Sequence, residues 1–382
     1  MLLRLSLSVL VGIVAGLAGL VPPVYAAPFI PGDVVVYRVG SGTGTLVSSG
    51  SPVYLDEYAP GGGLVQSIAM PTAASGSNLP LIASGTASSE GMLTRSTDGQ
   101  YLLLTGYGTT TGGSSSLASS AAATVNRVVG RVDSQGTIDT TTALTDFADK
   151  NNPRSAASTN GTDLWVGGAA GGVRYTTLGS TTSTQLSGDT NNIRQVAIFD
   201  GQLYISTNVS NYLLSSVGSG TPTATGQSLT PLALPAGLAS PDAYVFLDMD
   251  GTPGVDTLYV ADDTLGVLKY CLIGGVWTAE GTKGNGTNAY RGLTATVDET
   301  GVTLYITRKG GSGAAGGGEL VSLLDSSGFG ATMSGSFVLL ATAPTDEAFR
   351  GVAMAPTPEP CTLALLLAGG ALVLGRRRGR QR

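Results

Sequence analysis

Hydrophobic residues between positions 28 and 357 fall in short runs that alternate with polar turns. The runs are rich in Val, Ile, Leu, Tyr and Thr, and clusters of Gly, Ser, Asn and Asp separate them. No long stretch has the 3.6-residue period of an amphipathic helix. Many short strands bounded by turn residues are typical of all-β proteins. The pattern therefore predicts an all-β domain over residues 28–357.

A short motif recurs in this domain: an apolar residue, an aromatic residue and a second apolar residue, placed just after a turn. The turns include Asn160-Gly161 and Asp200-Gly201, dipeptides that favour the backbone of tight hairpins. A strand that neighbouring sheets cover on both faces reads as consecutive apolar residues. We therefore expect the aromatic residues of the motif in the core. They are Trp165, Tyr204, Tyr259 and Tyr305.

The last repeat is incomplete, and the N-terminal end of the domain supplies what it lacks. Arg350 opens the run Arg-Gly-Val-Ala-Met-Ala, which matches the run that Arg291 opens, but no further strands follow it. Strand-like runs at residues 33–39, 52–58 and 64–70 complete its sheet. A ring closed in this way has no free sheet edge, which is the principle of a β-propeller.

We therefore predict a β-propeller whose N- and C-terminal strands share one blade. Counting the repeats gives six blades, with seven as the alternative because residues 70–150 have room for another hairpin. An open β-sandwich also explains the alternating runs, but it does not explain the matching ends.

Composition argues against most enzyme classes. Histidine is absent and only Cys271 and Cys361 are cysteines, which excludes His-dependent triads, His metal sites and a disulfide framework. The adjacent carboxylates of Asp262 and Asp263 point to opposite faces of a strand, whereas a glycosidase needs two carboxyl groups that face each other across a cleft. We therefore predict that the protein is not an enzyme.

Arginines open the strand that precedes the aromatic motif in most repeats. In a propeller this position lies at one mouth of the central channel, so these arginines are candidate ligands of an anion, such as an acidic sugar or a phosphate group. The alternative is structural: each guanidinium pairs with an acid or with carbonyl groups of the next blade. The arginines are Arg95, Arg154, Arg194, Arg291 and Arg350.

A second candidate site is the acidic loop over residues 248–256. Its oxygen-bearing side chains stand at positions 1, 3, 5 and 9, a spacing that resembles short calcium loops built from hard oxygen ligands. Pro253 interrupts the usual glycine region, and no glutamate stands at position 12. Calcium is therefore a candidate cofactor, and the alternative is that the aspartates serve as turn residues. The candidate ligands are Asp248, Asp250, Thr252 and Asp256.

The N-terminal end has the composition of a secretory signal peptide. Arg4 precedes an apolar stretch over residues 5–20, and residues 24–26 provide a small-residue cleavage site. We therefore predict a signal peptide over residues 1–27, with a retained membrane anchor as the alternative.

At the C-terminal end, Pro358, Glu359 and Pro360 are followed by an uncharged run over residues 361–375 and then by five arginines. The run predicts a transmembrane helix with the arginines in the cytoplasm, although at about 1.5 Å per residue it is short for a bilayer. The alternative is a plain tail anchor.

This tail, residues 358–382, resembles the PEP-CTERM sorting signal. The order of Pro-Glu-Pro, apolar helix and arginine cluster carries the resemblance, and Cys361 departs from it because a small hydroxylated residue is more usual there. The resemblance implies an exosortase-type membrane protease as a partner, which processes the chain near Pro358-Glu359-Pro360. It also implies export to the cell envelope or extracellular matrix, with membrane attachment only before processing.

The charge of the domain completes the prediction. Six of the 20 basic residues but only one of the 26 acidic residues lie in the two ends, so the domain is more acidic than the whole chain and is a poor nucleic-acid binder. We predict an exported, non-catalytic binding or scaffold propeller with extracellular polysaccharide as partner. The alternatives are a propeller enzyme acting on extracellular polysaccharide or phosphoesters, and a protein-interaction hub with an exposed apolar patch.

Overall fold

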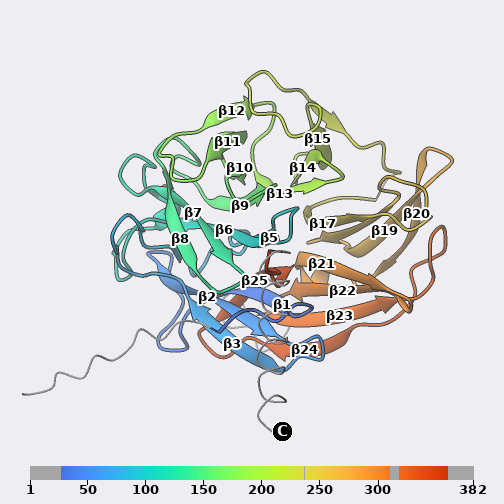
Figure 1. The fold of residues 1–382 in the computed structure, drawn as a ribbon, viewed down its shortest axis with the longest axis horizontal. Coiled ribbons are helices and arrows are strands. Elements are labelled where there is room, and N and C mark those ends of the chain that lie inside the picture. Colours follow the sequence, from blue (N-terminus) through green and yellow to red (C-terminus); the bar gives the residue numbers. More distant parts are fainter. Residues whose placement is uncertain (1–26, 236, 310–317, 360–382) are drawn as a thin grey trace, which may run out of the picture.

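Antiparallel β-sheets arranged around a common axis make up the protein (Figure 1). The computed structural model describes residues 27–235, 237–309 and 318–359. Within these ranges the regular elements are β-strands and two short 3-10 helices, Leu117–Ser119 and Gly286–Asn288. The predicted all-β class and the propeller arrangement are confirmed.

Four of the sheets are separate and have four strands each. In each of them the strands pair in chain order, and the first strand lies closest to the axis (Figure 1), which is the arrangement of a propeller blade. Their strands are β9 (Pro153–Ser158), β10 (Asp163–Gly168), β11 (Val173–Thr177) and β12 (Thr184–Ser187); β13 (Ile193–Phe199), β14 (Gln202–Thr207), β15 (Leu214–Val217) and β16 (Leu229–Pro231); β17 (Pro241–Leu247), β18 (Thr257–Asp262), β19 (Gly266–Ile273) and β20 (Val276–Lys283); and β21 (Tyr290–Asp298), β22 (Gly301–Arg308), β23 (Glu319–Asp325) and β24 (Val338–Thr342).

The remaining strands form one nine-stranded sheet. Two antiparallel paths run through it, β25-β1-β2-β3 and β5-β6-β7-β8, and the two-residue strand β4 pairs with both β2 and β6. The strands are β1 (Val34–Val39), β2 (Ser51–Tyr58), β3 (Leu64–Ala69), β4 (Ile82–Ala83), β5 (Thr94–Arg95), β6 (Tyr101–Tyr107), β7 (Arg127–Asp133), β8 (Ile138–Leu144) and β25 (Ala348–Met354).

The number of separate blades therefore differs from the prediction. The structure has four separate blades and a nine-stranded sheet, where six separate blades were expected. The physical cause is β4, whose two residues are buried and whose backbone bonds the strands on both of its sides. The segment between Met70 and Leu93 contributes only this short strand and one isolated bridge, so it supplies no hairpin for a seventh blade.

The chain ends meet in this nine-stranded sheet. β1 and β25 pair in antiparallel register, with Val36 opposite Val352 and Val39 opposite Ala348. Every residue of both strands is buried. The prediction that the first and last strands share one sheet is confirmed.

The aromatic motif lies on the second strand of each separate blade. Trp165, Tyr259 and Tyr305 are buried, as expected. Tyr204 is only half-buried, which corrects the prediction for that residue. Its ring packs against Phe246 of the next blade, with the ring centroids 4.7 Å apart.

Two predicted segments lie outside the described residues. They are residues 1–26 of the signal peptide and the C-terminal run 361–375. Among the residues that the structure does describe, no helix is both long and apolar enough for a membrane crossing.

Candidate functional site

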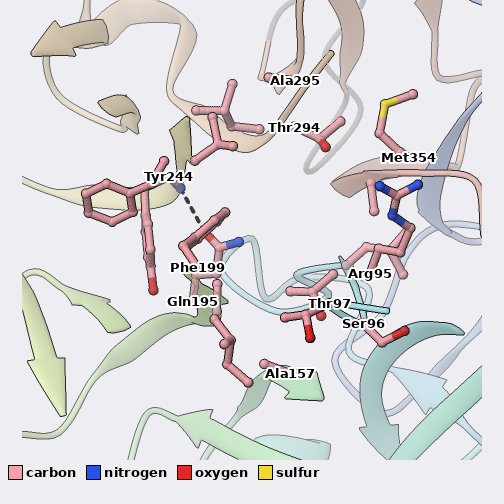
Figure 2. A pocket seen from close by; sticks show the side chains of 18 of the residues that line it. Arg95, Ser96, Thr97, Ala157, Gln195, Phe199, Tyr244, Thr294, Ala295 and Met354 are labelled. Atoms are coloured by element: carbon pink, nitrogen blue, oxygen red, sulfur yellow. Dashed lines mark hydrogen bonds between the residues drawn. The ribbon is translucent and has the colours of Figure 1, made fainter. Parts of the chain in front are cut away.

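The innermost strands surround a cavity of about 490 Å³ (Figure 2). Its walls come from β5, β9, β13, β17, β21 and β25 and the residues that follow them. Small-molecule sites have volumes of roughly 300–1,000 Å³. Arg95 and Asp200 are the charged residues among the described residues that line it.

Gln195 presents a hydrogen-bond donor to this cavity. The side chain is 5% exposed, and its Oε1 accepts a hydrogen bond from the backbone N–H of Tyr244 at 2.7 Å. Figure 2 shows the amide reaching from β13 into the open middle of the pocket. Its Nε2 has no hydrogen-bond partner among the described residues, so a ligand oxygen can take this donor.

Arg95 stands on the other side of the cavity (Figure 2). Its Nη1 donates to the backbone oxygen of Ala355 at 3.2 Å. Within the described residues its Nε and Nη2 have no partner. Desolvation lowers the pKa of Arg95, but a guanidinium still keeps its charge at neutral pH.

The other four predicted arginines do not line the cavity. The backbone N–H of Met92 bonds the carbonyl of Arg154 at 3.0 Å, so Met92 lies beside Arg154, and Arg95 lies three residues further along. The prediction that all five arginines share one repeat position is therefore wrong for Arg95. The cause is the shortness of β5, a two-residue strand that starts after this level.

The four arginines connect neighbouring blades. Arg194 forms an ion pair with Asp242 of the next blade. Arg291 Nε donates to Asp263 Oδ1 at 3.0 Å, and Arg154 Nη1 donates to the backbone oxygen of Ile193 at 3.4 Å. Arg350 Nη2 donates to the backbone oxygen of Gly85 at 3.3 Å. These contacts favour the structural alternative for these four residues, since each guanidinium bonds an acid or a backbone carbonyl group of another segment.

Two buried acids in the same region were not predicted from the sequence. Asp242 stands on β17, where the other separate blades begin with an arginine, and burial raises its pKa to about 7 although Arg194 opposes the shift. Glu90 accepts a hydrogen bond from the Tyr107 hydroxyl at 2.6 Å, and burial raises its pKa too. The sequence offered one signal for Asp242: it stands two residues before Tyr244, at the repeat position that an arginine takes in the other separate blades.

The raised pKa of Asp242 is expected to make stability depend on pH. The unfolded chain has a pKa near 3.8 and the folded chain about 7, so the folded state holds the extra proton between these values and loses stability as pH rises toward 7. Each unit by which the pKa differs between the folded and unfolded chain corresponds to about 1.4 kcal/mol of folding stability. For a domain of this size, that is a shift in Tm of roughly 3 °C.

Thermal unfolding at pH 5.5 and pH 8 tests this prediction. The parent should have the higher Tm at pH 5.5, and Asp242→Asn should reduce the difference between the two values. An unchanged difference in the variant would contradict the assignment of the proton to Asp242.

The acidic loop brings its three carboxylates together. Ligand atoms of Asp248, Asp250 and Asp256 lie within 4.8 Å of one another, and Asp248 and Asp250 are exposed. The Thr252 hydroxyl donates to Asp250 Oδ1 at 2.5 Å, and Asp256 Oδ2 accepts the backbone N–H of Asp250 at 2.7 Å. Aspartates that serve as turn residues make hydrogen bonds of this kind. Calcium binding therefore stays a prediction.

A calcium titration tests the loop. If the three carboxylates hold the cation, millimolar calcium raises the Tm of the parent because it binds only the folded state. Asp250→Asn removes one ligand charge at an exposed position and should abolish the rise. A parent Tm that calcium leaves unchanged would contradict the predicted metal site.

The first and the last described residues of the domain lie close together, because both contact the turn around Ser134. The backbone N–H of Phe29 donates to the oxygen of Ser134 at 2.9 Å, and Pro358 and Glu359 lie with Ser134 and Gln135 around a small surface cavity. Pro360, the last residue of the predicted sorting motif, lies outside the described residues.

No family model and no curated protein matches the chain. Among solved structures, the crystal structure of a nidogen/laminin complex is 11% identical with a TM-score of 0.49, over 85% of this chain and 98% of that chain. The crystal structure of the Niastella koreensis GH74 enzyme is 17% identical with a TM-score of 0.42, over 82% of this chain and 46% of that chain. The sheets themselves define a β-propeller protein.

Proposed function

We propose that this β-propeller is a non-catalytic binding protein that holds an extracellular polysaccharide in the cavity beside Arg95 and Gln195. The lining of the cavity carries the proposal. It offers hydrogen-bond donors between apolar walls, and Asp200 is the single carboxylate among its described residues. Hydrolysis of a glycoside requires two carboxyl groups roughly 5–10 Å apart, and the chain has no histidine to replace one of them.

The proposed location is the cell envelope, the outer surface or the extracellular matrix. The order of elements in residues 1–27 and 358–382 supports it, with an exosortase-type membrane protease as the partner that processes the tail. The place where the domain ends also supports it. Pro358 and Glu359 lie at the surface beside the turn of residues 133–135, so cleavage nearby would leave β25 within its sheet.

We also propose that the propeller has six blades. The paths β25-β1-β2-β3 and β5-β6-β7-β8 each contain four strands, as the separate blades do. β5 and β25 take innermost places beside β9 and β21 (Figure 1). In this count β4 is a bridge between two blades.

A binding experiment with a cavity-filling variant tests the function. Thr294 lines the cavity, so Thr294→Trp should block it and abolish retention of the protein on acidic polysaccharide columns. Thr300 lies in an exposed turn outside the cavity, so Thr300→Trp is the matched control and should bind as the parent does.

The same samples distinguish a binding protein from an enzyme. The parent should leave the length of the polysaccharide unchanged during prolonged incubation. Equal retention of Thr294→Trp and parent would contradict binding in the cavity. Shortened products that disappear with Asp200→Asn would contradict the non-catalytic function.

A further inference from the structure

We infer that the ligand of the cavity is an acidic saccharide whose carboxylate is bound by Arg95 and whose second acceptor oxygen is bound by Gln195. This inference names the ligand class of the cavity and rests on the proposed binding function. It distinguishes carboxylated sugars, such as uronic acids, from neutral sugars and from inorganic anions.

The free edge of the Arg95 guanidinium indicates a carboxylate. Nη1 is held by the backbone oxygen of Ala355, which leaves Nε and Nη2 without partners among the described residues. Two parallel N–H groups match the two oxygens of a planar carboxylate. Because Arg95 is the single cation among the described residues of the lining, the site fits one negative charge better than the two of a phosphate dianion.

The second contact is fixed by the neighbouring blade. The Tyr244 backbone N–H holds Gln195 Oε1, so the amide cannot turn over without losing this hydrogen bond. The Gln195 NH₂ group must therefore face the cavity, as it does in Figure 2. This donor is fixed in direction and open to the cavity, so a hydroxyl or ring oxygen of a sugar can accept its hydrogen bond.

The remaining walls fit the body of a sugar rather than a free ion. Phe199, Ala295 and Met354 present apolar surface, and Thr97 and Thr294 add hydroxyl groups (Figure 2). A volume of about 490 Å³ lies in the range of sites for organic ligands. Sugar rings present both C–H and hydroxyl groups, so they can use both kinds of wall.

Calorimetric titration of the whole protein tests the inference. The probes are oligogalacturonate, a malto-oligosaccharide of the same length, and inorganic phosphate. The parent should bind oligogalacturonate at least tenfold more tightly than the neutral sugar. The binding should weaken as salt rises, since salt screens an exposed charge pair.

Two variants remove the two contacts separately. Arg95→Gln should abolish the preference for the acidic sugar. Gln195→Glu keeps an oxygen for the Tyr244 N–H but turns a second oxygen toward the cavity, so it should weaken oligogalacturonate binding at least tenfold. Arg131 lies outside the cavity and pairs with Asp139 at 3.3 Å, so Arg131→Gln is the matched control and should bind as the parent does.

The outcomes separate the inference from the proposed function. Equal binding of acidic and neutral sugars, blocked by Thr294→Trp, overturns the inference and leaves the function intact. Phosphate that displaces oligogalacturonate at equal concentration also overturns it. Binding of no saccharide at all overturns both. If circular dichroism shows that Gln195→Glu does not fold, the Arg95→Gln titration decides.

Discussion

Lys269→Met should lower the free energy of unfolding by about 3–5 kcal/mol. The Lys269 side chain is 1% exposed, and its Nζ lies 2.9 Å from Asp325 Oδ2. It also donates to the backbone oxygens of Gly328 at 2.7 Å and Ala331 at 3.0 Å. Methionine fills a similar volume but leaves the carboxylate and both carbonyl groups without their cation. Removing one partner of a buried ion pair is much more destabilising than replacing both.

Urea unfolding followed by circular dichroism measures this loss. Lys150 is exposed, so Lys150→Met is the matched control and should change the free energy of unfolding by less than about 0.5 kcal/mol. A Lys269→Met variant within 1 kcal/mol of the parent would show that the ammonium is not buried in the blade formed by β17–β20.

Trp165→Ala should cost about 3–5 kcal/mol. The Trp165 side chain is 2% exposed and belongs to a core cluster with Ile193 and Val196 of the next blade. Its ring packs on Tyr175 with the centroids 5.4 Å apart, and its Nε1 donates to the backbone oxygen of Pro222 at 2.8 Å. Alanine leaves a large cavity between two blades and removes this hydrogen bond.

The second tryptophan of the chain supplies the comparison. Trp277 lies half-buried on β20, the outermost strand of its blade, so Trp277→Ala removes the same atoms from a position that water already reaches. The loss of stability should be clearly smaller than for Trp165→Ala. Equal losses in urea unfolding would contradict the burial of the aromatic motif between blades.

Ring closure could be predicted because it left a signal in the sequence. The run opened by Arg350 repeats the run opened by Arg291, and the strands missing after it stand at the N-terminal end. The joining of two blades left no such signal. β4 has two residues, and its pairing with Ser51, Pro52 and Tyr107 depends on contacts across more than 20 positions of sequence.

The candidate site was predictable only in part, for a similar reason. Arg95 was identified, but its level in the channel depends on where the short strand β5 begins. Gln195 gave no signal, because a lone glutamine within an apolar strand has no particular chemistry. It becomes a site residue only when the next blade brings the Tyr244 N–H against its oxygen. Such contacts between blades cannot be inferred from local pattern.

The cavity requires β25 and β1 to lie in one sheet, and a disulfide between them tests that pairing directly. Val36 and Val352 are opposite each other, and antiparallel partners have Cα atoms about 4.5–5.5 Å apart, within reach of a disulfide. The experiment uses Val36→Cys with Val352→Cys in a chain whose Cys271 and Cys361 are replaced by Ser. A protease site inserted in the exposed loop of residues 223–226 then cuts the chain between the two new cysteines.

The matched control is Val39→Cys with Met354→Cys, which lie at opposite ends of the paired strands, roughly 17 Å apart at 3.3 Å per residue. After oxidation and cleavage, the Val36/Val352 pair should keep both fragments in one band on a non-reducing gel, and the control should release them. Two separate fragments from the Val36/Val352 pair would contradict the closed ring.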